Sequence, residues 1–368
     1  MKTSLRSAAT PSPQRRSRRR VYDRPYPKTR PSGQHPRRRF LRLAVGAAAL
    51  PTVSCDPGTQ SYPSRPITMI VPYAAGGGSD VIARNVAERM KASLGQPVII
   101  ENITGASGTI GTGRVAHARP DGYMLGIGNV NTHVMNGAMF ALQYDVANDF
   151  EPVALLTTAP FLFLAKKALP ADDLKGLIAW LKANPYKASL GTTGTTALDH
   201  IAGVLFQKEI GTSFGFVPYR GGAPALQGLV AGQIDLAIPD PPASLPAVRA
   251  GLVKAYAVMA KDRLPAAPDI PTVDEAGLPG FYADFWYGLW APAHTPHNII
   301  AQLSAAVVNA LADAGVRARL ADMGEEIFPR DQQTRARAAV AGSGVQTHNV
   351  GWPKRRNAER PPEFCNPR

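Results

Sequence analysis

Residues 71–80 read VPYAAGGGSD, and they stand between an apolar run and an amphipathic one. The run that leads into them, ITMIVPY (67–73), is rich in β-branched side chains and predicts a buried strand. After them, apolar residues recur from Val81 to Met90 at close to helical spacing, which predicts a helix with Asp80 as its N-cap. Glycine in such a turn lets the backbone approach another group with no Cβ in the way. The stretch therefore predicts a strand–turn–helix unit that holds something at the turn.

The same alternation continues along the chain. PVIIEN (97–102) and YMLGIGNV (123–130) read as further strands, with a Gly/Ser/Thr loop and a short helix at 114–118 between them. The pattern then restarts, and VPYAAGG at 71–77 recurs as VPYRGGA at 217–223. We expect an α/β fold of two similar lobes with largely parallel sheets, each lobe aiming a glycine turn at a shared cleft.

Glycine turns that open helices favour anions, because the first helical turn has free N–H groups and the positive end of the helix dipole. Three such turns are visible, at Gly76–Asp80, Gly191–Thr196 and Gly221–Ala223, and Arg220 adds a positive charge beside the third. One such loop alone is as well explained as a tight connection between strand and helix. Three loops at the carboxyl ends of strands predict a site for a carboxylate or phosphate.

Known catalytic and cofactor motifs are absent from these loops. GGGSDV lacks the lysine of a phosphate-binding loop, GTIGTG (108–113) does not match G-x-G-x-x-G, and no nucleophile elbow is present. Asp199-His200 is better explained by helix capping or ligand contact than by a catalytic dyad. His294 and His297 have no acidic neighbour, and both cysteines lie in the tails. We expect no catalytic residue, no metal and no cofactor.

The basic charge of the chain lies at its ends. The formal net charge is +14, but residues 1–60 hold 14 Lys and Arg against 2 Asp and Glu, and residues 335–368 hold 7 against 2. Residues 61–334 hold 20 basic against 23 acidic residues. A nucleic-acid-binding domain would carry the basic charge itself, so this pattern argues against a nucleic-acid partner.

An export signal is predicted near the start. Residues 37–42, RRRFLR, precede a short apolar run that ends at Leu50, and together they resemble a twin-arginine signal peptide. We therefore expect residues 1–60 to be a disordered leader plus signal, and the mature protein to be periplasmic. Lipoprotein anchoring at Cys55 is the less favoured reading, because Thr52 replaces the usual aliphatic residue.

A longer set of motifs resembles one family, the extracytoplasmic solute receptors of tripartite tricarboxylate transporters (the Bug or TctC family). The matching segments are YPSRPITMIVPYAAGGGSDVIAR, VIIENITGASGTIGT, RPDGYMLGIGN, DFEPVALL, VPYRGGAPALQGLVAGQIDLA, PDIPTVDEAGLPGF and FWYGLWAPAHTP. The resemblance implies a type II periplasmic-binding-protein fold, in which two α/β lobes close over a ligand around a two-strand hinge. It implies one lobe of residues 61–163 with 288–334 and a second lobe of residues 164–287.

The resemblance also implies function. It implies a receptor without enzymatic activity that captures a small carboxylate (a dicarboxylate, amino acid or aromatic acid) for the membrane subunits of a transporter, and we expect a monomer. Carried onto this chain, the ligand-binding positions are Tyr73, Gly76, Gly77, Gly78, Ser79, Asp80, Asn131, Thr132, Gly194, Thr195, Thr196, Arg220, Gly221, Gly222, Ala223 and Asp240. Tyr73, Phe161 and Trp286 are expected to shape the pocket.

Two alternatives and one departure accompany this reading. A ligand sensor for a signalling partner would use the same site, and a periplasmic enzyme on the same scaffold would need a nucleophile and a base in the cleft. The family normally ends in an amphipathic helix, whereas residues 335–368 are basic, rich in Pro and Arg, and lack periodicity after Ala341. We expect this tail to be disordered.

Overall fold

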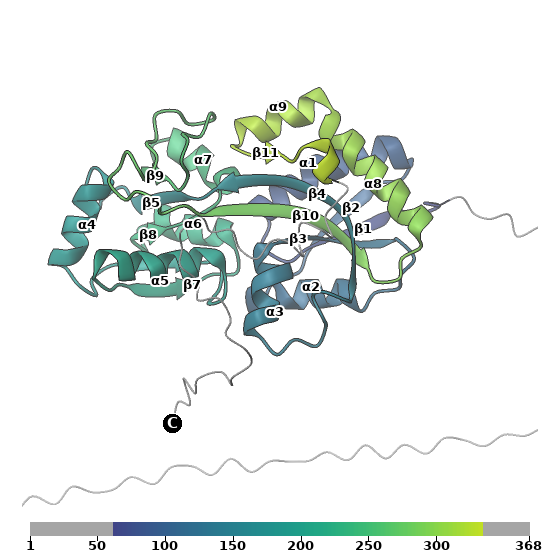
Figure 1. The fold of residues 1–368 in the computed structure, drawn as a ribbon, viewed down its shortest axis with the longest axis horizontal. Coiled ribbons are helices and arrows are strands. Elements are labelled where there is room, and N and C mark those ends of the chain that lie inside the picture. Colours follow the sequence, from purple (N-terminus) through teal and green to yellow (C-terminus); the bar gives the residue numbers. More distant parts are fainter. Residues whose placement is uncertain (1–61, 334–368) are drawn as a thin grey trace, which may run out of the picture. The chain divides into compact units, whose positions relative to one another are not determined.

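The computed structural model describes residues 62–333, so the predicted leader, export signal and basic tail lie outside the described residues. Two mixed sheets organise this part of the chain (Figure 1). The first has the order β11-β4-β10-β3-β1-β2 and the second the order β7-β6-β8-β5-β9. The strands of the first sheet are β1 (Ile67–Val71), β2 (Val98–Asn102), β3 (Met124–Asn129), β4 (Phe150–Pro160), β10 (Asp284–Pro292) and β11 (Glu326–Ile327). Those of the second are β5 (Leu162–Lys166), β6 (Ser189–Thr192), β7 (Gly215–Pro218), β8 (Leu236–Ala237) and β9 (Val253–Val258).

Helices connect these strands and cover the sheets. Those of the first half are α1 (Gly78–Leu94), α2 (Thr109–Ala116), α3 (Asn136–Met139) and α4 (Leu174–Ala183), with a 3₁₀ turn at Ala106–Gly108 and a π-helical turn at Asn131–Met135. Those of the second half are α5 (Leu198–Ile210), α6 (Gly222–Val230), α7 (Pro241–Arg249), α8 (His297–Ala312), α9 (Ala314–Asp322) and α10 (Arg330–Gln333). Within residues 62–333 no single helix has the length and apolar character to cross a bilayer, although the bent pair α8–α9 would pass by length and composition.

The chain passes between the sheets along paired strands. β4 runs directly into β5, and β4 and β10 pair antiparallel over their whole lengths, side by side through the middle of Figure 1. At the crossing, the Phe161 amide donates to the Ala283 carbonyl at 3.0 Å, and the Ala283 amide donates to the Met259 carbonyl at 2.9 Å. Two sheets joined by paired crossing strands are the arrangement expected of the two lobes and hinge of a type II periplasmic-binding-protein fold. The residue limits predicted for each lobe stay a prediction.

Two expectations about the elements were wrong in part. The pairs β1–β2, β1–β3, β6–β7 and β6–β8 are parallel, but β10, β11, β5 and β9 pair antiparallel with their neighbours, because strands that return across the hinge run in the opposite direction. α2 starts at Thr109, five residues before the predicted helix. Its glycines are tolerated because they allow close packing: a Cβ on Gly111 would lie 2.6 Å from the Ile103 carbonyl oxygen.

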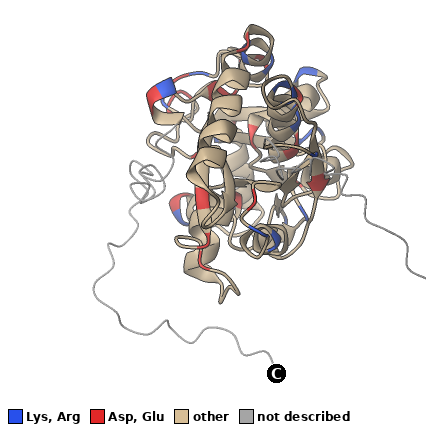
Figure 2. Cartoon of the chain, turned by 90° about the vertical axis from the view of Figure 1, so that its right-hand side faces the viewer, with Lys and Arg blue, Asp and Glu red and all other residues tan. Residues whose placement is uncertain are grey.

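One apolar cluster holds the sheets and helices together. It includes Ile67 and Met69 of β1, Val86 of α1, Phe163 of β5 and Phe206 of α5, none more than 1% exposed. Burial of so many large side chains is the main stabilising contribution to the fold. In Figure 2, acidic and basic residues are interspersed along the ribbon, and neither sign dominates the side in view.

Candidate ligand-binding site

The two copies of the Val-Pro-Tyr motif face each other across the junction of the sheets. The Ala74 amide, just after the first copy, donates to the Arg220 carbonyl of the second at 3.2 Å. The glycine turns that follow the two motifs also lie close to each other. A Cβ on Gly77 would be 3.7 Å from the Ala223 amide nitrogen and 3.8 Å from the Gly222 amide nitrogen. Gly77 is the N-cap of α1 and Gly221 that of α6. The N-termini of two helices from different sheets therefore meet at one point.

A small cavity of about 40 Å³ lies at this meeting point. Seven predicted site residues line it: Tyr73, Gly77, Gly78, Ser79, Asn131, Gly222 and Asp240. The rest of its wall consists of Asn129, Phe161, Thr193, Asp199, Ile238, Pro239, Phe285 and Tyr287. The wall contains no Lys, Arg or His among the described residues, so its hydrogen-bond donors are backbone amides and neutral side chains.

The donors at this cavity are suited to an anion. Gly78 and Ser79 are the first two residues of α1 and Gly222 is the first of α6, and amides at these positions have no partner within their own helices. The Tyr73 hydroxyl is buried and has no hydrogen-bond partner. Together with the positive ends of two helix dipoles, these groups form a neutral site that favours negative charge.

Asn131 joins the two sheets at the edge of the cavity. Asn131 begins the turn that follows β3. Its side-chain oxygen accepts a hydrogen bond at 2.9 Å from the amide of Leu198, the first residue of α5. The N-cap of α5, Ala197, has no side-chain oxygen to offer. A residue of the turn after β3 thus caps α5, which follows β6 of the second sheet.

Asp240 occupies the meeting point of the helices. It is the N-cap of α7, is 9% exposed, and accepts a short hydrogen bond from the Tyr287 hydroxyl of β10. A Cβ on Gly78 would overlap its Oδ2 atom. Burial raises the pKa of Asp240, although the hydrogen bond from Tyr287 acts in the opposite direction.

Asp199 is the second acid of the wall. Its Oδ2 accepts from the Thr193 amide at 2.7 Å, and its Oδ1 accepts from the Thr193 hydroxyl at 3.2 Å and the His200 amide at 2.8 Å. Burial raises its pKa to about 7 against the effect of these bonds, and the charge of Asp240 adds to the rise. Asp199 therefore orders the Thr193 loop; it is the second residue of α5 and does not cap it, so the helix-capping expectation was wrong, whereas its place in the cavity wall leaves ligand contact open.

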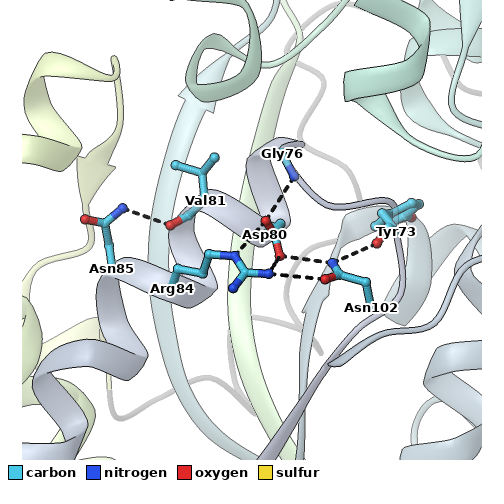
Figure 3. A network of polar contacts seen from close by, with 7 residues as sticks. All are labelled: Tyr73, Gly76, Asp80, Val81, Arg84, Asn85 and Asn102. Carbon is cyan, nitrogen blue, oxygen red and sulfur yellow. Dashed lines mark hydrogen bonds and ion pairs between the residues drawn. The ribbon is translucent and has the colours of Figure 1, made fainter. Parts of the chain in front are cut away.

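Asp80 was wrongly predicted as an N-cap. It is the third residue of α1, and its Oδ2 reaches back to accept from the Gly76 amide at 2.9 Å (Figure 3). Arg84 donates to both carboxylate oxygens, and Asn102 donates to Oδ1 and to the Tyr73 carbonyl. Burial acts to raise the pKa of Asp80, but the bonds from Arg84, Gly76 and Asn102 outweigh it and lower the pKa. This carboxylate orders the glycine turn and does not line the cavity.

Other predicted residues lie around a second, outer cavity of about 370 Å³. Gly194, Thr195 and Arg220 line it, and it shares Tyr73 and Thr193 with the inner cavity. Ser107 and Gly108, from the Gly/Ser/Thr loop before α2, line its other side. The two cavities therefore lie along one junction, separated by a tyrosine and a threonine.

The remaining predicted residues support the turns. The Thr132 hydroxyl accepts from the Asn129 amide, and the Thr196 hydroxyl donates to the Asn136 side chain at 2.9 Å across the sheets. Gly76 has a positive φ of 83° that permits its turn, and Gly221 and Ala223 form the start of α6 against the first motif. Their role as ligand contacts stays a prediction.

Several wall residues were missed from the sequence. Asn129 ends a strand, a position that favours site residues, but nothing in its immediate sequence distinguishes it; Thr193 belongs to the predicted Gly191–Thr196 turn but was left out of the ligand-binding set. Trp286 was expected to shape the pocket, but side chains alternate along β10, so Phe285 and Tyr287 face the cavity instead. Trp286 packs near Trp290, with ring centroids 5.8 Å apart. Among residues 62–333 no group of three or more His, Cys, Asp or Glu could hold a metal ion.

Comparison with known families gives one match over most of the chain. The model of the tripartite tricarboxylate transporter family receptor (TctC) matches residues 82–344. A UPF0065 protein of the TAR-I ttuE-ttuC' intergenic region of Agrobacterium vitis is 40% identical over 298 residues, 81% of this chain and 86% of that protein. BugT of Bordetella pertussis is 35% identical over 296 residues, 80% of this chain and 89% of that protein.

Solved structures are similar over the same region. The structure of MatC from Rhodopseudomonas palustris with bound malate has a TM-score of 0.73 and 40% identity, and covers 76% of this chain and 97% of that one. The periplasmic binding protein BugD has a TM-score of 0.73 and 36% identity, with 76% and 94% covered. Another R. palustris protein, solved with adipate, has a TM-score of 0.72 and 32% identity, with 76% and 95% covered.

Proposed function

Because the chain belongs to the family of tripartite tricarboxylate transporter receptors, whose members are solute-binding proteins, we propose that it captures a small carboxylate between its two lobes. The ligand would bind to the first-turn amides of α1 and α6, with the Tyr73 hydroxyl as a further donor. The observation that carries this proposal is the convergence of two helix N-termini, one from each sheet, on a cavity without a charged donor.

Capture would follow from the geometry of two lobes. A ligand that contacts α1 and α6 together gains both sets of bonds only when the lobes are closed, so it shifts the equilibrium toward the closed form. The bound malate and adipate of two relatives support a carboxylate, and dicarboxylates are accordingly the first candidates. The Gly76, Asp80, Thr132, Gly194, Thr195, Thr196, Arg220, Gly221 and Ala223 positions would contribute by shaping the turns and the outer cavity.

We further propose that the closed, monomeric receptor delivers its ligand to the membrane subunits of a tripartite tricarboxylate transporter. Periplasmic relatives support a periplasmic location, and the export signal is proposed to be of the twin-arginine type, without anchoring at Cys55. Fractionation of cells that express an Arg37→Lys, Arg38→Lys variant tests the signal, since retention in the cytoplasm is expected and unchanged export would contradict it.

A thermal-shift panel tests the proposed ligand class. The exported full chain is heated with malate, adipate, succinate, amino acids and aromatic acids, and with sugars and nucleosides as controls. A ligand that binds only the native state raises the melting temperature by mass action, so at least one carboxylate should raise it while the sugars do not. A folded sample whose melting temperature no carboxylate changes would contradict the proposal.

A further inference from the structure

One carboxyl group lies beside the position where the proposed ligand carboxylate is expected. The Asp240 Oδ2 atom accepts the hydrogen bond from Tyr287 and would be overlapped by a Cβ on Gly78. Its Oδ1 atom lies 3.7 Å from the position of a Cβ on Gly222. The group is therefore held between the first residues of α1 and α6, the same amides that would bind a ligand.

Within residues 62–333, no positive side chain lines the cavity beside this acid. The titratable groups that face Asp240 are Tyr287 from β10, Glu325 from the residues before β11, Asp199 from α5 and Tyr73 from the turn after β1. All are neutral or acidic, and the described wall of the cavity holds no Lys, Arg or His. Arg84 is paired with Asp80, and Arg220 lines only the outer cavity.

We propose that Asp240 contacts the ligand directly and holds its carboxylate through a shared proton, so that capture of a carboxylate takes up one proton. This inference rests on the proposed function. Because the Tyr287 hydroxyl donates to Oδ2, that oxygen serves as an acceptor and the proton lies on Oδ1, beside Gly222. The proton comes from solvent when the lobes close and returns to solvent when they open, and no covalent bond changes.

The electrostatics of the site agree with this arrangement. Burial raises the pKa of Asp240, and a ligand carboxylate in contact with it would raise it further. Two adjacent carboxyl groups in a water-poor site share a proton because both cannot be ionised together. The proposal requires the group to be ionised in the ligand-free, open protein, where contact with water favours the charged form.

Calorimetric titration tests the proposal on the full chain. Malate and adipate are titrated between about pH 6.5 and 9, where both are fully ionised, in buffers that differ in ionisation enthalpy. We expect uptake of about one proton for each ligand molecule bound. The Kd of the ligand should therefore rise about tenfold per pH unit. Equal affinity across this range without proton uptake would overturn the inference and leave carboxylate capture standing.

Matched variants assign the proton to a residue. Asp240→Asn keeps a donor of the same shape but cannot titrate, so it should bind malate without proton uptake and with a Kd independent of pH. Glu325→Gln, at a buried acid outside the cavity wall, is the control and should keep the uptake.

Each further outcome has a distinct meaning. Proton uptake that persists in Asp240→Asn would overturn the assignment to this residue. If the Asp240→Asn protein does not fold, the proton count of the wild-type protein still decides whether uptake occurs at all. If malate, adipate and every other carboxylate of the panel fail to bind at any pH, the proposed function itself is wrong.

Discussion

Gly77 and Gly78 are adjacent in the turn that begins α1, but only one of them has room for a side chain. A Cβ on Gly77 meets nothing closer than the Ala74 carbonyl oxygen at 3.5 Å, which is ordinary contact. A Cβ on Gly78 would overlap Asp240 and lie 2.5 Å from the Tyr287 hydroxyl. The requirement for glycine is therefore set by a partner from another part of the chain.

The difference between the two glycines leads to a prediction for Gly78→Ala, with Gly77→Ala as its control. In Gly78→Ala the new methyl group pushes Asp240 out of the meeting point of the helices, so the lobes cannot close and the thermal shift with a binding carboxylate should be lost. Gly77→Ala should keep most of the shift. Thermal-shift titration of both variants measures this. Equal shifts in the two variants would mean that the closed geometry is not required for binding.

The sequence predicted some residues of the site and failed to predict others. Seven of the predicted residues line the inner cavity. The three glycines among them, Gly77, Gly78 and Gly222, carry the local signal of a strand–helix junction, whereas Asp240 was implied only by the family resemblance. Asp80 was mistaken for an N-cap because an acid near a helix start has the same sequence signature whether it caps or reaches back to Gly76. Asp199 and Tyr287 come close to Asp240 only through the fold, and no local pattern reports that.

At the scale of elements, α5 begins without a capping side chain of its own, and Asn131 supplies one from the first sheet. Such a cap exists only while the sheets are together. The strand–turn–helix units themselves were predictable, because periodicity and glycine punctuation are local. The antiparallel hinge strands were not, because strand direction depends on which lobe the chain returns to.

The capping of α5 by Asn131 leads to a second prediction. Asn131→Ala removes the acceptor for the Leu198 amide, and the loss weakens only the closed form, by about 1 kcal/mol. We expect weaker carboxylate binding by roughly fivefold with little change in the melting temperature of the ligand-free protein. Thr132→Ser is the control, since it keeps the adjacent hydroxyl group. A melting temperature that falls in Asn131→Ala while affinity is unchanged would refute this role.

At the scale of the whole molecule, buried acids couple folding to pH. Burial raises the pKa of Glu325 to about 8, and the charge of Asp240 adds to the rise. The folded state then binds more protons than the unfolded state between the ordinary pKa of a glutamate and about 8. Stability is therefore greatest at low pH in this window and falls as the pH rises toward 8.

Glu325→Gln tests this linkage, because the amide has a similar shape and does not ionise. Its melting temperature should match that of the wild-type protein near pH 5 and exceed it near pH 8, by about 2–4 °C for each kcal/mol of ionisation penalty removed. Glu326→Gln, at the exposed neighbour, should show no such pH-dependent gain. A difference between Glu325→Gln and wild type that is constant from pH 5 to pH 8 would contradict the assignment.

The central claim is that a carboxylate is held between the lobes by the N-termini of α1 and α6. A crystal structure of the complex with a carboxylate that gives a thermal shift tests it most directly. We expect the carboxylate oxygens to lie about 2.7–3.2 Å from first-turn amides of both helices, with Tyr73 and Asp240 in contact. A carboxylate bound by one lobe alone, or outside the junction of the two sheets, would contradict the claim.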